Sequence, residues 1–426
     1  MRLGQQGIAA WMGIAAFALA GCAGIPGAPA RQAHWVASWG TANMVPDDGN
    51  LLPAESYRDA SLRELVHVSL GGDRIRVRLS NVWGTQPLTI EAATVALSTG
   101  TGQAGIVAST LRKLTFSGRE SIMIPARAEY YSDPVELTHS PGADLALSIH
   151  YGEPPATQTG HPGSRTTSFL VKGNRVAETA WPDAQKIVRW YQIADVEVQA
   201  PSSVHAVSAI GDSITDGHGA TTDGNDRWSD ALARRLQREG LAMGVVNTGI
   251  GGNRLLRDGL GPNVASRFDR DVVARAGVTH AIVLISVNDM GILHRNQMDT
   301  PQARAQLVAD LESGFRQIVE RAHAHGICMI GGTVVPYSNS NYYHPGPENE
   351  NDRLALNEWI RTSGVFDAIA DFDAALRDPQ HPERMLAGDD MGDGLHPSPA
   401  GFRAMAEAVP LEALRRCPRA VGAGVP

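Results

Sequence analysis

The sequence predicts an α/β three-layer sandwich that follows an antiparallel β-sandwich in the same chain. Between His34 and about Ala200 the apolar runs are short, rich in Val, Ile and Leu, and separated by turns, which is typical of antiparallel sheets. From His205 onward, strand-like runs alternate with helical patterns, and this alternation indicates parallel strands with right-handed crossovers. We therefore expect a β-sandwich domain over residues 34–200 and an α/β domain over residues 201–418.

The composition is that of a globular protein with enough apolar material for a core. The chain has 426 residues, of which 43% are hydrophobic and 19% are charged. Its formal net charge is -8, and no basic cluster offsets it. This balance argues against a nucleic-acid partner, because the phosphate backbone attracts basic surfaces.

The N-terminal residues have the pattern of a bacterial targeting segment. The stretch from Ile8 to Ala20 is apolar and too short to span a bilayer comfortably. Leu19-Ala20-Gly21-Cys22 resembles a lipobox, which implies a signal peptide over 1–22, a lipid on Cys22 and a flexible tether over 23–33. We therefore expect secretion across the inner membrane and a lipoprotein in the periplasm or outer membrane, held only by that lipid. The alternative is an ordinary signal peptide with a chance cysteine.

The β-rich half contains short runs that favour strands. These runs are Leu62–Leu70, Arg74–Leu79, Leu88–Leu97, Ser121–Ala126, Ala143–Tyr151 and Ile187–Val198. Charged and apolar residues alternate strictly over Arg74–Leu79, so one face of this strand is expected to be buried and the other wet. Gly71-Gly72-Asp73, just before it, favours a tight hairpin.

The second half alternates strands with helices. Strands are expected at 204–210, 244–248, 280–286, 327–335 and 366–370, and helices at 226–239, 265–276, 302–325 and 349–362. The helix over 302–325 follows Thr300-Pro301 and stops at Gly326, as start and stop signals require. A last helix near Pro399–Arg416 is interrupted by Pro410. In such folds the carboxyl ends of the parallel strands meet at one edge, where the chemistry takes place.

Four short polar blocks fall near the expected strand ends or before the last helix. They are Gly211-Asp212-Ser213, the glycine-rich stretch Asn247–Asn253, Ser286-Val287-Asn288-Asp289, and Asp393-Gly394-Leu395-His396. A serine hydroxyl, a carboxylate and an imidazole are the three parts of an activated nucleophile. Each block alone is weak evidence for a function, but the order of the four blocks and their placement near the expected strand ends or before the last helix together indicate a hydrolase.

These blocks resemble those of the SGNH or GDSL hydrolase superfamily, whose esterases and lipases have a flavodoxin-like α/β fold. The most similar subset has an extracellular β-rich domain before the catalytic domain, and Leu79–Thr85 and Arg361–Asp367 also resemble its motifs. One position departs from the family, which usually has glycine where this chain has Ser286. The bulkier residue is expected to shift that loop or narrow the pocket.

The resemblance implies a role for each residue of the site. Ser213 would be the nucleophile, His396 would take its proton, and Asp393 would orient His396 and stabilise its charged form. The oxyanion hole would consist of the backbone N–H groups of Ser213 and Gly252 and the side-chain amide of Asn288.

Other polar residues near these blocks are expected to be structural. Asp212 and Asp289 are interpreted as hydrogen-bonding braces for their loops, and Asp216 as a turn residue. His323 and His325 are interpreted as part of a solvated helix end, because their spacing does not place them together on one helix face as metal ligands.

Two further features leave alternatives open. The segment 336–351, with Tyr337, Tyr342 and Tyr343, follows a strand on the catalytic side and is expected either to line the substrate pocket or to be an exposed polar loop. Cys328 lies in an apolar run and is interpreted as a core thiol, although an oxidising compartment also permits a disulfide with Cys417.

The sequence favours a serine esterase that hydrolyses carboxylic esters through an acyl-enzyme. Short acyl or acetyl esters, including those on polysaccharides, are the expected substrates, and no cofactor and no metal are expected. An acyltransferase with the same triad is one alternative. A catalytically inert lipoprotein that binds carbohydrate or envelope material is another.

Overall fold

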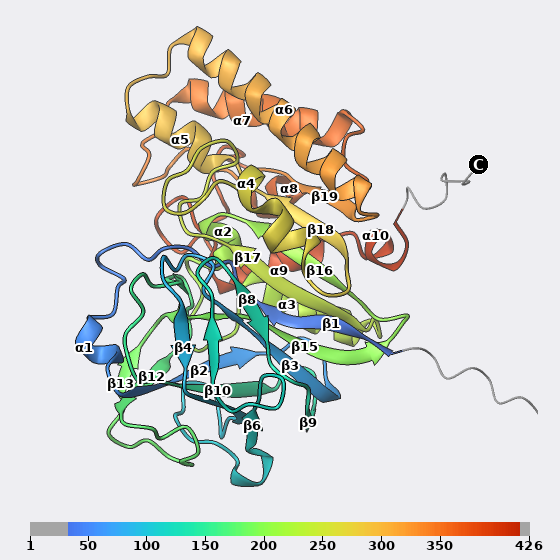
Figure 1. Ribbon diagram of the computed structural model, residues 1–426. Helices are drawn as coiled ribbons and strands as arrows, with labels where there is room; N and C mark the ends of the chain where they lie inside the picture. The colour runs from blue at the N-terminus through green and yellow to red at the C-terminus, as the bar shows by residue number, and fades with distance from the viewer. Residues whose placement is uncertain (1–32, 418–426) are drawn as a thin grey trace, which may run out of the picture. The chain divides into compact units, whose positions relative to one another are not determined.

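The computed structural model describes residues 33–417, which belong to one compact unit that begins at Ala33 (Figure 1). The predicted signal peptide, the lipobox cysteine Cys22 and nearly all of the tether over 23–33 lie outside the described residues. None of the helices within 33–417 is long and apolar enough to cross a membrane.

The N-terminal half is a sandwich of two antiparallel sheets, as predicted. One sheet contains β1 (Ala33–Gly40), β15 (Ile193–Pro201), β3 (Gly72–Ser80) and β8 (Glu129–Tyr131) in that order, with β9 (Val135–His139) also paired to β3. The other contains, in order, β13 (Gln185–Ile187), β12 (Ser168–Lys172), β2 (Ala60–His67), β10 (Asp144–Tyr151), β5 (Ala92–Leu97) and β6 (Arg112–Leu114). Apolar side chains of both sheets, such as Val77 and Leu147, share one core.

Several short elements complete this half. The strands β4 (Leu88–Ile90) and β7 (Ile122–Ile124) form one pair, and β11 (Gly160–His161) and β14 (Trp190–Tyr191) form another. The short helix α1 (Ala54–Tyr57) precedes β2, and a 3-10 turn covers Ala108–Thr110.

The predicted hairpin at Gly71-Gly72-Asp73 is wrong. The strand β2 pairs with β10 and β12, whereas β3 pairs with β15, β8 and β9. The two consecutive strands therefore belong to different sheets, and the turn carries the chain from one layer of the sandwich to the other. Turn residues signal a reversal of the chain, but they do not determine which strands pair.

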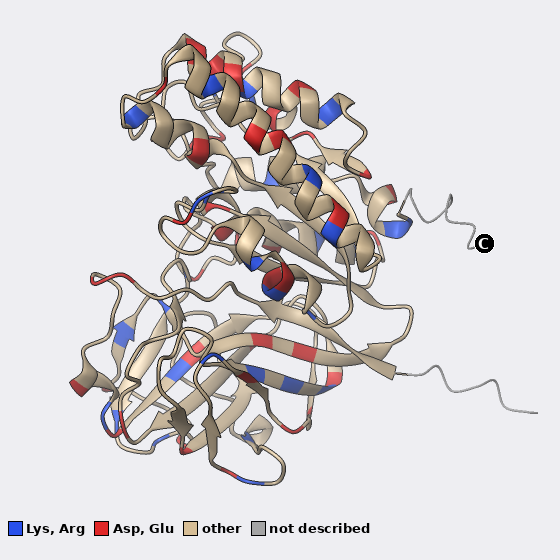
Figure 2. Cartoon of the chain, turned by 45° about the horizontal axis from the view of Figure 1, so that its top comes forward, with Lys and Arg blue, Asp and Glu red and all other residues tan. Residues whose placement is uncertain are grey.

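The charged face of β3 is only partly wet, in contrast to the prediction. Arg78 is 4% exposed and forms ion pairs with Asp195 on β15 and Glu129 on β8. Figure 2 shows the basic residues of one strand beside the acidic residues of its neighbour. Arg275, from the second half of the chain, also pairs with Asp195. That half covers this part of the sheet, which explains the burial.

The C-terminal half has a five-stranded parallel sheet, as predicted. Its strands are β16 (His205–Gly211), β17 (Met243–Gly249), β18 (Val278–Leu284), β19 (Cys328–Gly332) and β20 (Ala368–Ala370). Their order in the sheet is β17-β16-β18-β19-β20, and every neighbouring pair is parallel. Counted along this half, the order is 2-1-3-4-5, which is the flavodoxin-like arrangement.

Helices cover this sheet and complete the three-layer sandwich (Figure 1). They are α2 (Ser213–Asp216), α3 (Trp228–Arg238), α4 (Val264–Phe268), α5 (Val287–Arg295), α6 (Pro301–Ala324), α7 (Pro347–Thr362), α8 (Phe372–Leu376), α9 (Pro399–Ala408) and α10 (Leu411–Arg415). The predicted helix over 265–276 is divided, because a π-helical segment over Asp269–Val273 follows α4. The α6 helix begins as predicted, since the Thr300 side chain accepts a hydrogen bond from the N–H of Ala303.

A disulfide joins Cys328, at the start of β19, to Cys417, just after α10. Of the two alternatives that the sequence left open, the structure therefore contains the disulfide. It closes a loop with a sequence separation of 89 residues and ties the C-terminal helices to the sheet.

The two halves are joined by backbone and side-chain contacts. The N–H of Ala37 in β1 donates to the carbonyl of Ala276, and the N–H of Val245 in β17 donates to the hydroxyl of Ser69. Strand β1 lies against β17, so the β-rich half covers the edge strand of the parallel sheet. This arrangement protects an edge that would otherwise be open to pairing.

Candidate active site

The turn after β16 presents Ser213 at the carboxyl edge of the parallel sheet. β16 ends at Gly211, where a Cβ would collide with the backbone carbonyl of Leu284, so the close approach requires glycine. Asp212 then caps α2 by accepting a hydrogen bond from the N–H of Ile214 at 3.0 Å. Ser213 is the first residue of that helix, and it follows the strand that borders the reversal of strand order.

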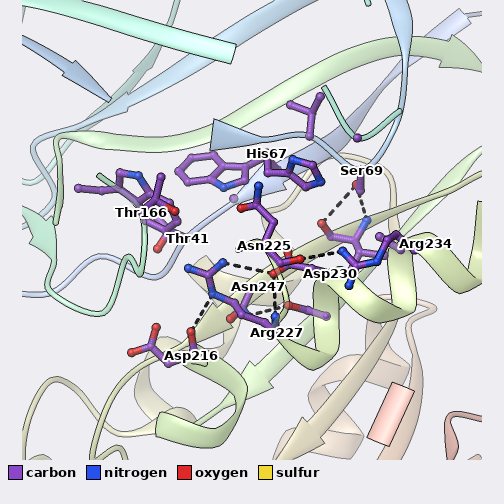
Figure 3. A pocket seen from close by; sticks show the side chains of 18 of the residues that line it. Thr41, His67, Ser69, Thr166, Asp216, Asn225, Arg227, Asp230, Arg234 and Asn247 are labelled. Atoms are coloured by element: carbon purple, nitrogen blue, oxygen red, sulfur yellow. Dashed lines mark hydrogen bonds and ion pairs between the residues drawn. The ribbon is translucent and has the colours of Figure 1, made fainter. Parts of the chain in front are cut away.

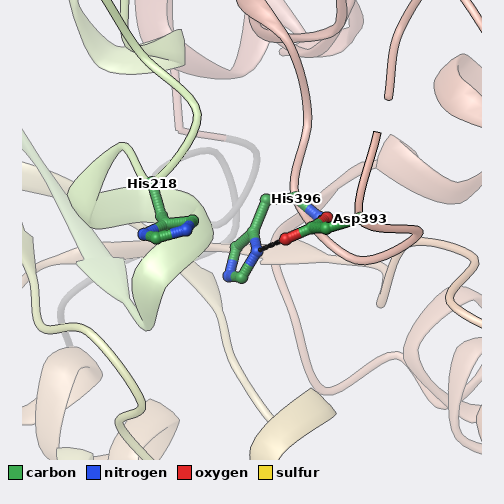
Figure 4. Close-up of side chains that lie close together, drawn as sticks. All are labelled: His218, Asp393 and His396. Carbon is green, nitrogen blue, oxygen red and sulfur yellow. Dashed lines mark hydrogen bonds and ion pairs between the residues drawn. The ribbon is translucent and has the colours of Figure 1, made fainter. Parts of the chain in front are cut away.

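The structure brings Ser213 together with Asp393 and His396, although Ser213 lies 183 residues before His396 in the sequence. The Oγ of Ser213 is 2.8 Å from Nε2 of His396. On the other side of the ring, Nδ1 of His396 is 2.6 Å from Oδ2 of Asp393, a contact drawn in Figure 4. An ionised carboxylate only accepts hydrogen bonds, so Nδ1 of His396 carries the proton. The other ring nitrogen is therefore left to accept the proton of the Ser213 hydroxyl.

Asp393 is held as a carboxylate by the same loop. Burial would raise the pKa of Asp393, but hydrogen bonds from the side chain and the backbone N–H of His396 outweigh it and hold the pKa well below its usual range. The backbone N–H groups of Leu395 and His396 both donate to Oδ1 of Asp393, at 2.9 and 2.8 Å. The carboxylate is therefore negatively charged and held next to Nδ1 of His396, where it would stabilise the positive charge of a protonated His396.

The backbone N–H groups of Ser213 and Gly252 make no hydrogen bond within residues 33–417, although Gly252, unlike Gly251, does not line the cavity beside Ser213. Gly252 has a φ of +68°, a left-handed conformation that favours glycine. Backbone donors without partners at a strand end and a helix start are suited to bind an anionic oxygen.

Asn288 is oriented by hydrogen bonds on both sides of its amide. Its Nδ2 donates to the carbonyl of Asn253 at 2.8 Å, and its Oδ1 accepts from the hydroxyl of Tyr343 at 2.5 Å. These contacts determine which way the amide points and leave a second Nδ2 hydrogen to donate. Ser286, just before α5, has a φ of +108°, so a side chain stands where the backbone favours glycine. It does not line the cavity beside Ser213.

Two residues that support the site were not identified from the sequence. The interpretation of Asp216 as a turn residue is wrong, because its carboxylate accepts hydrogen bonds from the N–H of Gly251 at 3.0 Å and from His161 at 2.8 Å. It thus braces the loop that carries Gly252 against the β-rich half. Arg267 is buried and donates to Oδ1 of Asn253, whose carbonyl holds Asn288.

Neither supporting residue carries a motif. Asp216 lies three residues after Ser213, but its partner His161 lies 55 residues away in the other half. Arg267 lies in a predicted helix, where a buried arginine cannot be distinguished from a solvated one. Asp212 and Asp289 act as the braces that the sequence predicted, since Asp289 accepts from the N–H groups of Leu255 and Leu256.

A cavity of about 200 Å³ opens beside Ser213 and is lined by both halves of the chain. The β-rich half contributes Met44, Asp47, Asn50, His161, Pro162, Gly163 and Arg165, and the α/β half contributes Ser213, Asp216, His218, Ile250, Gly251 and Leu260. The β-rich half therefore reaches the candidate active site, a point on which the sequence is silent. A second cavity, of about 40 Å³, lies farther along the interface around Arg227 and Asp230 (Figure 3) and has room only for a few water molecules.

The three tyrosines proposed for substrate binding lie in different surroundings. Tyr343 contacts Asn288, as described, and Tyr337 is buried in the core at 1% exposure. Tyr342 is 52% exposed and lines another cavity with His294. None of the three lines the cavity at Ser213, so their part in substrate binding stays a prediction.

His218, Asp393 and His396 are close enough that one atom from each could share a metal ion (Figure 4). Both ring nitrogens of His396, however, already take part in hydrogen bonds, with Asp393 and with Ser213. The geometry of this cluster therefore suits proton transfer better than metal binding.

Residues 209–404 match the family described as GDSL-like Lipase/Acylhydrolase, and this segment contains all four sequence blocks. No curated protein matches the chain. Among solved structures, a GDSL-like lipase from Bacteroides thetaiotaomicron VPI-5482 is similar over 49% of this chain and 87% of its own, with 16% identity and a TM-score of 0.35. A catalytic mutant of an acetylxylan esterase from Geobacillus stearothermophilus is similar over 50% of this chain and 93% of its own, with 19% identity and a TM-score of 0.36.

Proposed function

Residues 209–404 form a GDSL-like lipase/acylhydrolase domain, and we propose on that premise that the protein is a serine esterase that hydrolyses carboxylic esters through an acyl-enzyme. The observation that supports this most directly is the chain of hydrogen bonds from Ser213 through His396 to Asp393. A serine hydroxyl is inert at its own pKa and needs such a base to attack a carbonyl.

Each step of the reaction uses a group already described. The Oγ of Ser213 bonds to the ester carbonyl carbon while Nε2 of His396 takes its proton. The resulting oxyanion accepts hydrogen bonds from the backbone N–H groups of Ser213 and Gly252 and from the amide of Asn288. When the intermediate collapses, the C–O bond to the alcohol breaks and His396 returns the proton to the leaving oxygen. Water, activated by His396, then hydrolyses the acyl-enzyme and restores Ser213.

The proposed substrates are short acyl or acetyl esters, including those on polysaccharides. The cavity at Ser213 has a volume of about 200 Å³, and much of its lining is polar, with Asp47, Asn50 and Arg165 on the side of the β-rich half. A long acyl chain needs an extended apolar surface, whereas the apolar part of this lining is small and consists of Met44, Pro162, Ile250 and Leu260. An ester that joins a small acyl group to a hydroxylated alcohol fits the polar groups of this cavity better.

Pre-steady-state kinetics with p-nitrophenyl acetate tests the proposal. We expect a burst of nitrophenol in proportion to the enzyme, followed by slower turnover, because the acyl-enzyme accumulates. Ser213→Ala should lose the burst entirely, and p-nitrophenyl palmitate should be a much poorer substrate than the acetate. Wild-type protein that shows neither burst nor turnover would exclude the esterase.

We further propose that the chain is an exported lipoprotein with a lipid on Cys22. The motif Leu19-Ala20-Gly21-Cys22 supports it, and so does the disulfide between Cys328 and Cys417, because disulfides persist in oxidising compartments. Radiolabelled palmitate should be incorporated into the protein expressed in a bacterium, and Cys22→Ser should prevent the labelling. Labelling that survives Cys22→Ser would contradict this proposal.

A further inference from the structure

His218 lies against the base of the proposed triad, but no step of the mechanism uses it. The ring centroids of His218 and His396 are 4.2 Å apart, with an angle of 49° between the ring planes (Figure 4). The backbone N–H of His218 donates to the carbonyl of Ser213 at 2.8 Å, which ties the residue to the nucleophile turn. Its side chain lines the cavity beside Ser213.

Arg165, from the β-rich half, determines the tautomer of His218. The Nη2 of Arg165 lies 2.6 Å from Nδ1 of His218. A guanidinium can only donate hydrogen bonds, so Nδ1 of His218 must be the acceptor and carries no proton. In a neutral imidazole the single proton is then on Nε2.

The surroundings of His218 keep the ring neutral. Burial, together with the positive charges of His396 and Arg165, lowers the pKa of His218 to about 4, although the carboxylates of Asp393 and Asp216 act in the opposite direction. At neutral pH the residue is therefore an uncharged hydrogen-bond donor. A neutral neighbour also avoids a second positive charge beside His396 when that ring is protonated.

The Nε2–H of His218 has no hydrogen-bond partner among the described residues, and the side chain lines the substrate cavity. His396 must return its proton to the departing alcohol, so the alcohol part of the ester lies on the side of His396 and of the ring packed against it. A donor in this place faces the alcohol rather than the acyl group.

We propose that His218 donates its Nε2–H to a hydroxyl or ether oxygen of the alcohol part of the ester, and that Arg165 is the positioning residue that maintains this tautomer. The inference rests on the proposed esterase function and narrows its substrates to esters of oxygen-rich alcohols, such as sugar acetates. Asp47 and Asn50 line the same cavity and add polar groups that suit further hydroxyls. The β-rich half thereby takes part in substrate selection.

The test compares two acetates that differ only in the alcohol: phenyl acetate and a monoacetylated methyl glycoside. His218→Phe keeps an aromatic ring against His396 but removes the donor, so kcat/KM should fall about tenfold for the glycoside acetate and much less for phenyl acetate. His218→Gln keeps an amide donor and should lose less on the glycoside acetate than His218→Phe. Labelling of Ser213 by a fluorophosphonate reports that each variant is folded.

Arg165→Gln tests the positioning role by a pH profile. Without the guanidinium the pKa of His218 should rise, and a protonated His218 opposes the charge that His396 gains. The kcat/KM of this variant should therefore fall at a higher pH on the acid side than that of the wild type. Arg119→Gln is the matched control, because Arg119 is exposed in the same half and its side chain makes no hydrogen bond or ion pair within 33–417, so its profile should be that of the wild type.

Three results would overturn the inference. Equal losses on both acetates in His218→Phe would mean that the ring only supports His396, and unchanged kinetics would mean that it does neither. A proton on Nδ1, seen by nitrogen-15 NMR of the histidine rings, would exclude the tautomer. Because that measurement needs no turnover, it separates failure of the inference from failure of the esterase itself, which would appear as wild-type inactivity on both acetates.

Discussion

Ser286 shows how one side chain can store strain beside a proposed oxyanion donor. Its φ of +108° is costly for any residue with a Cβ, and its buried hydroxyl finds no hydrogen-bond partner in the described chain. We expect Ser286→Gly to raise the free energy of unfolding by about 1 kcal/mol, because the strain and the unsatisfied hydroxyl both disappear. Urea denaturation measures it, with Ser286→Ala as the control that keeps the Cβ. A glycine variant no more stable than the alanine variant would contradict this account.

The buried carboxyl group of Asp212 is expected to make the stability of the protein depend on pH. Burial and, to a smaller extent, the neighbouring Asp289 carboxylate raise the pKa of Asp212 to about 7. An unfolded aspartate titrates near pH 4, so between about pH 4 and 7 the folded state holds a proton that the unfolded state has lost. Stability therefore falls as pH rises through this window. Asp212→Asn keeps a side-chain oxygen for the α2 cap, and its free energy of unfolding should fall less steeply from pH 4 to 7; parallel curves for the two proteins would refute the prediction.

Among the elements, the C-terminal helices depend on the Cys328–Cys417 link. The loop that it closes has a sequence separation of 89 residues, and cross-links over long loops restrict the unfolded chain strongly. We expect replacement of both cysteines by serine to lower the free energy of unfolding by about 2–4 kcal/mol. Chemical denaturation with and without reductant measures this effect. Reductant should destabilise the wild type but leave the variant unchanged, and equal stability of the two oxidised proteins would count against the prediction.

The sequence predicts the elements of the α/β half well, because hydrophobic periodicity and caps are local signals. The start of α6 at Thr300 and Pro301 is an example. The same signals do not determine pairing between distant strands, so Gly71-Gly72-Asp73 suggested a hairpin where the chain changes sheets. The serine, histidine, aspartate and asparagine of the site were identifiable because each lies in a recognisable block. Asp216–His161 and Arg165–His218 were not, because their partners meet only when the halves pack together.

At the scale of the whole molecule, a buried ion pair couples the two halves. Asp195 in the β-rich half is fully buried and pairs with Arg275, which is 4% exposed and also donates to the carbonyl of Thr41. Arg275→Ala leaves the buried Asp195 with Arg78 as its remaining ion-pair partner and removes the donor to the carbonyl of Thr41, so it should lower the free energy of unfolding by about 1–3 kcal/mol. Calorimetry should show both halves melting in one transition at a lower temperature. Two separate transitions in the wild type would argue against coupling.

The two halves of the chain contribute different groups to the cavity beside Ser213. The proposed proton relay of Ser213, His396 and Asp393 lies wholly within the α/β half. One wall of the cavity beside Ser213 consists of loops around Asp47 and Arg165 in the other half. Under the proposed function, changes in those loops are expected to alter which ester is accepted, whereas the triad itself is left intact. Relatives whose β-rich halves differ are expected to differ in their substrates rather than in the reaction. A library of variants randomised only in those loops is therefore the natural route to a new substrate preference.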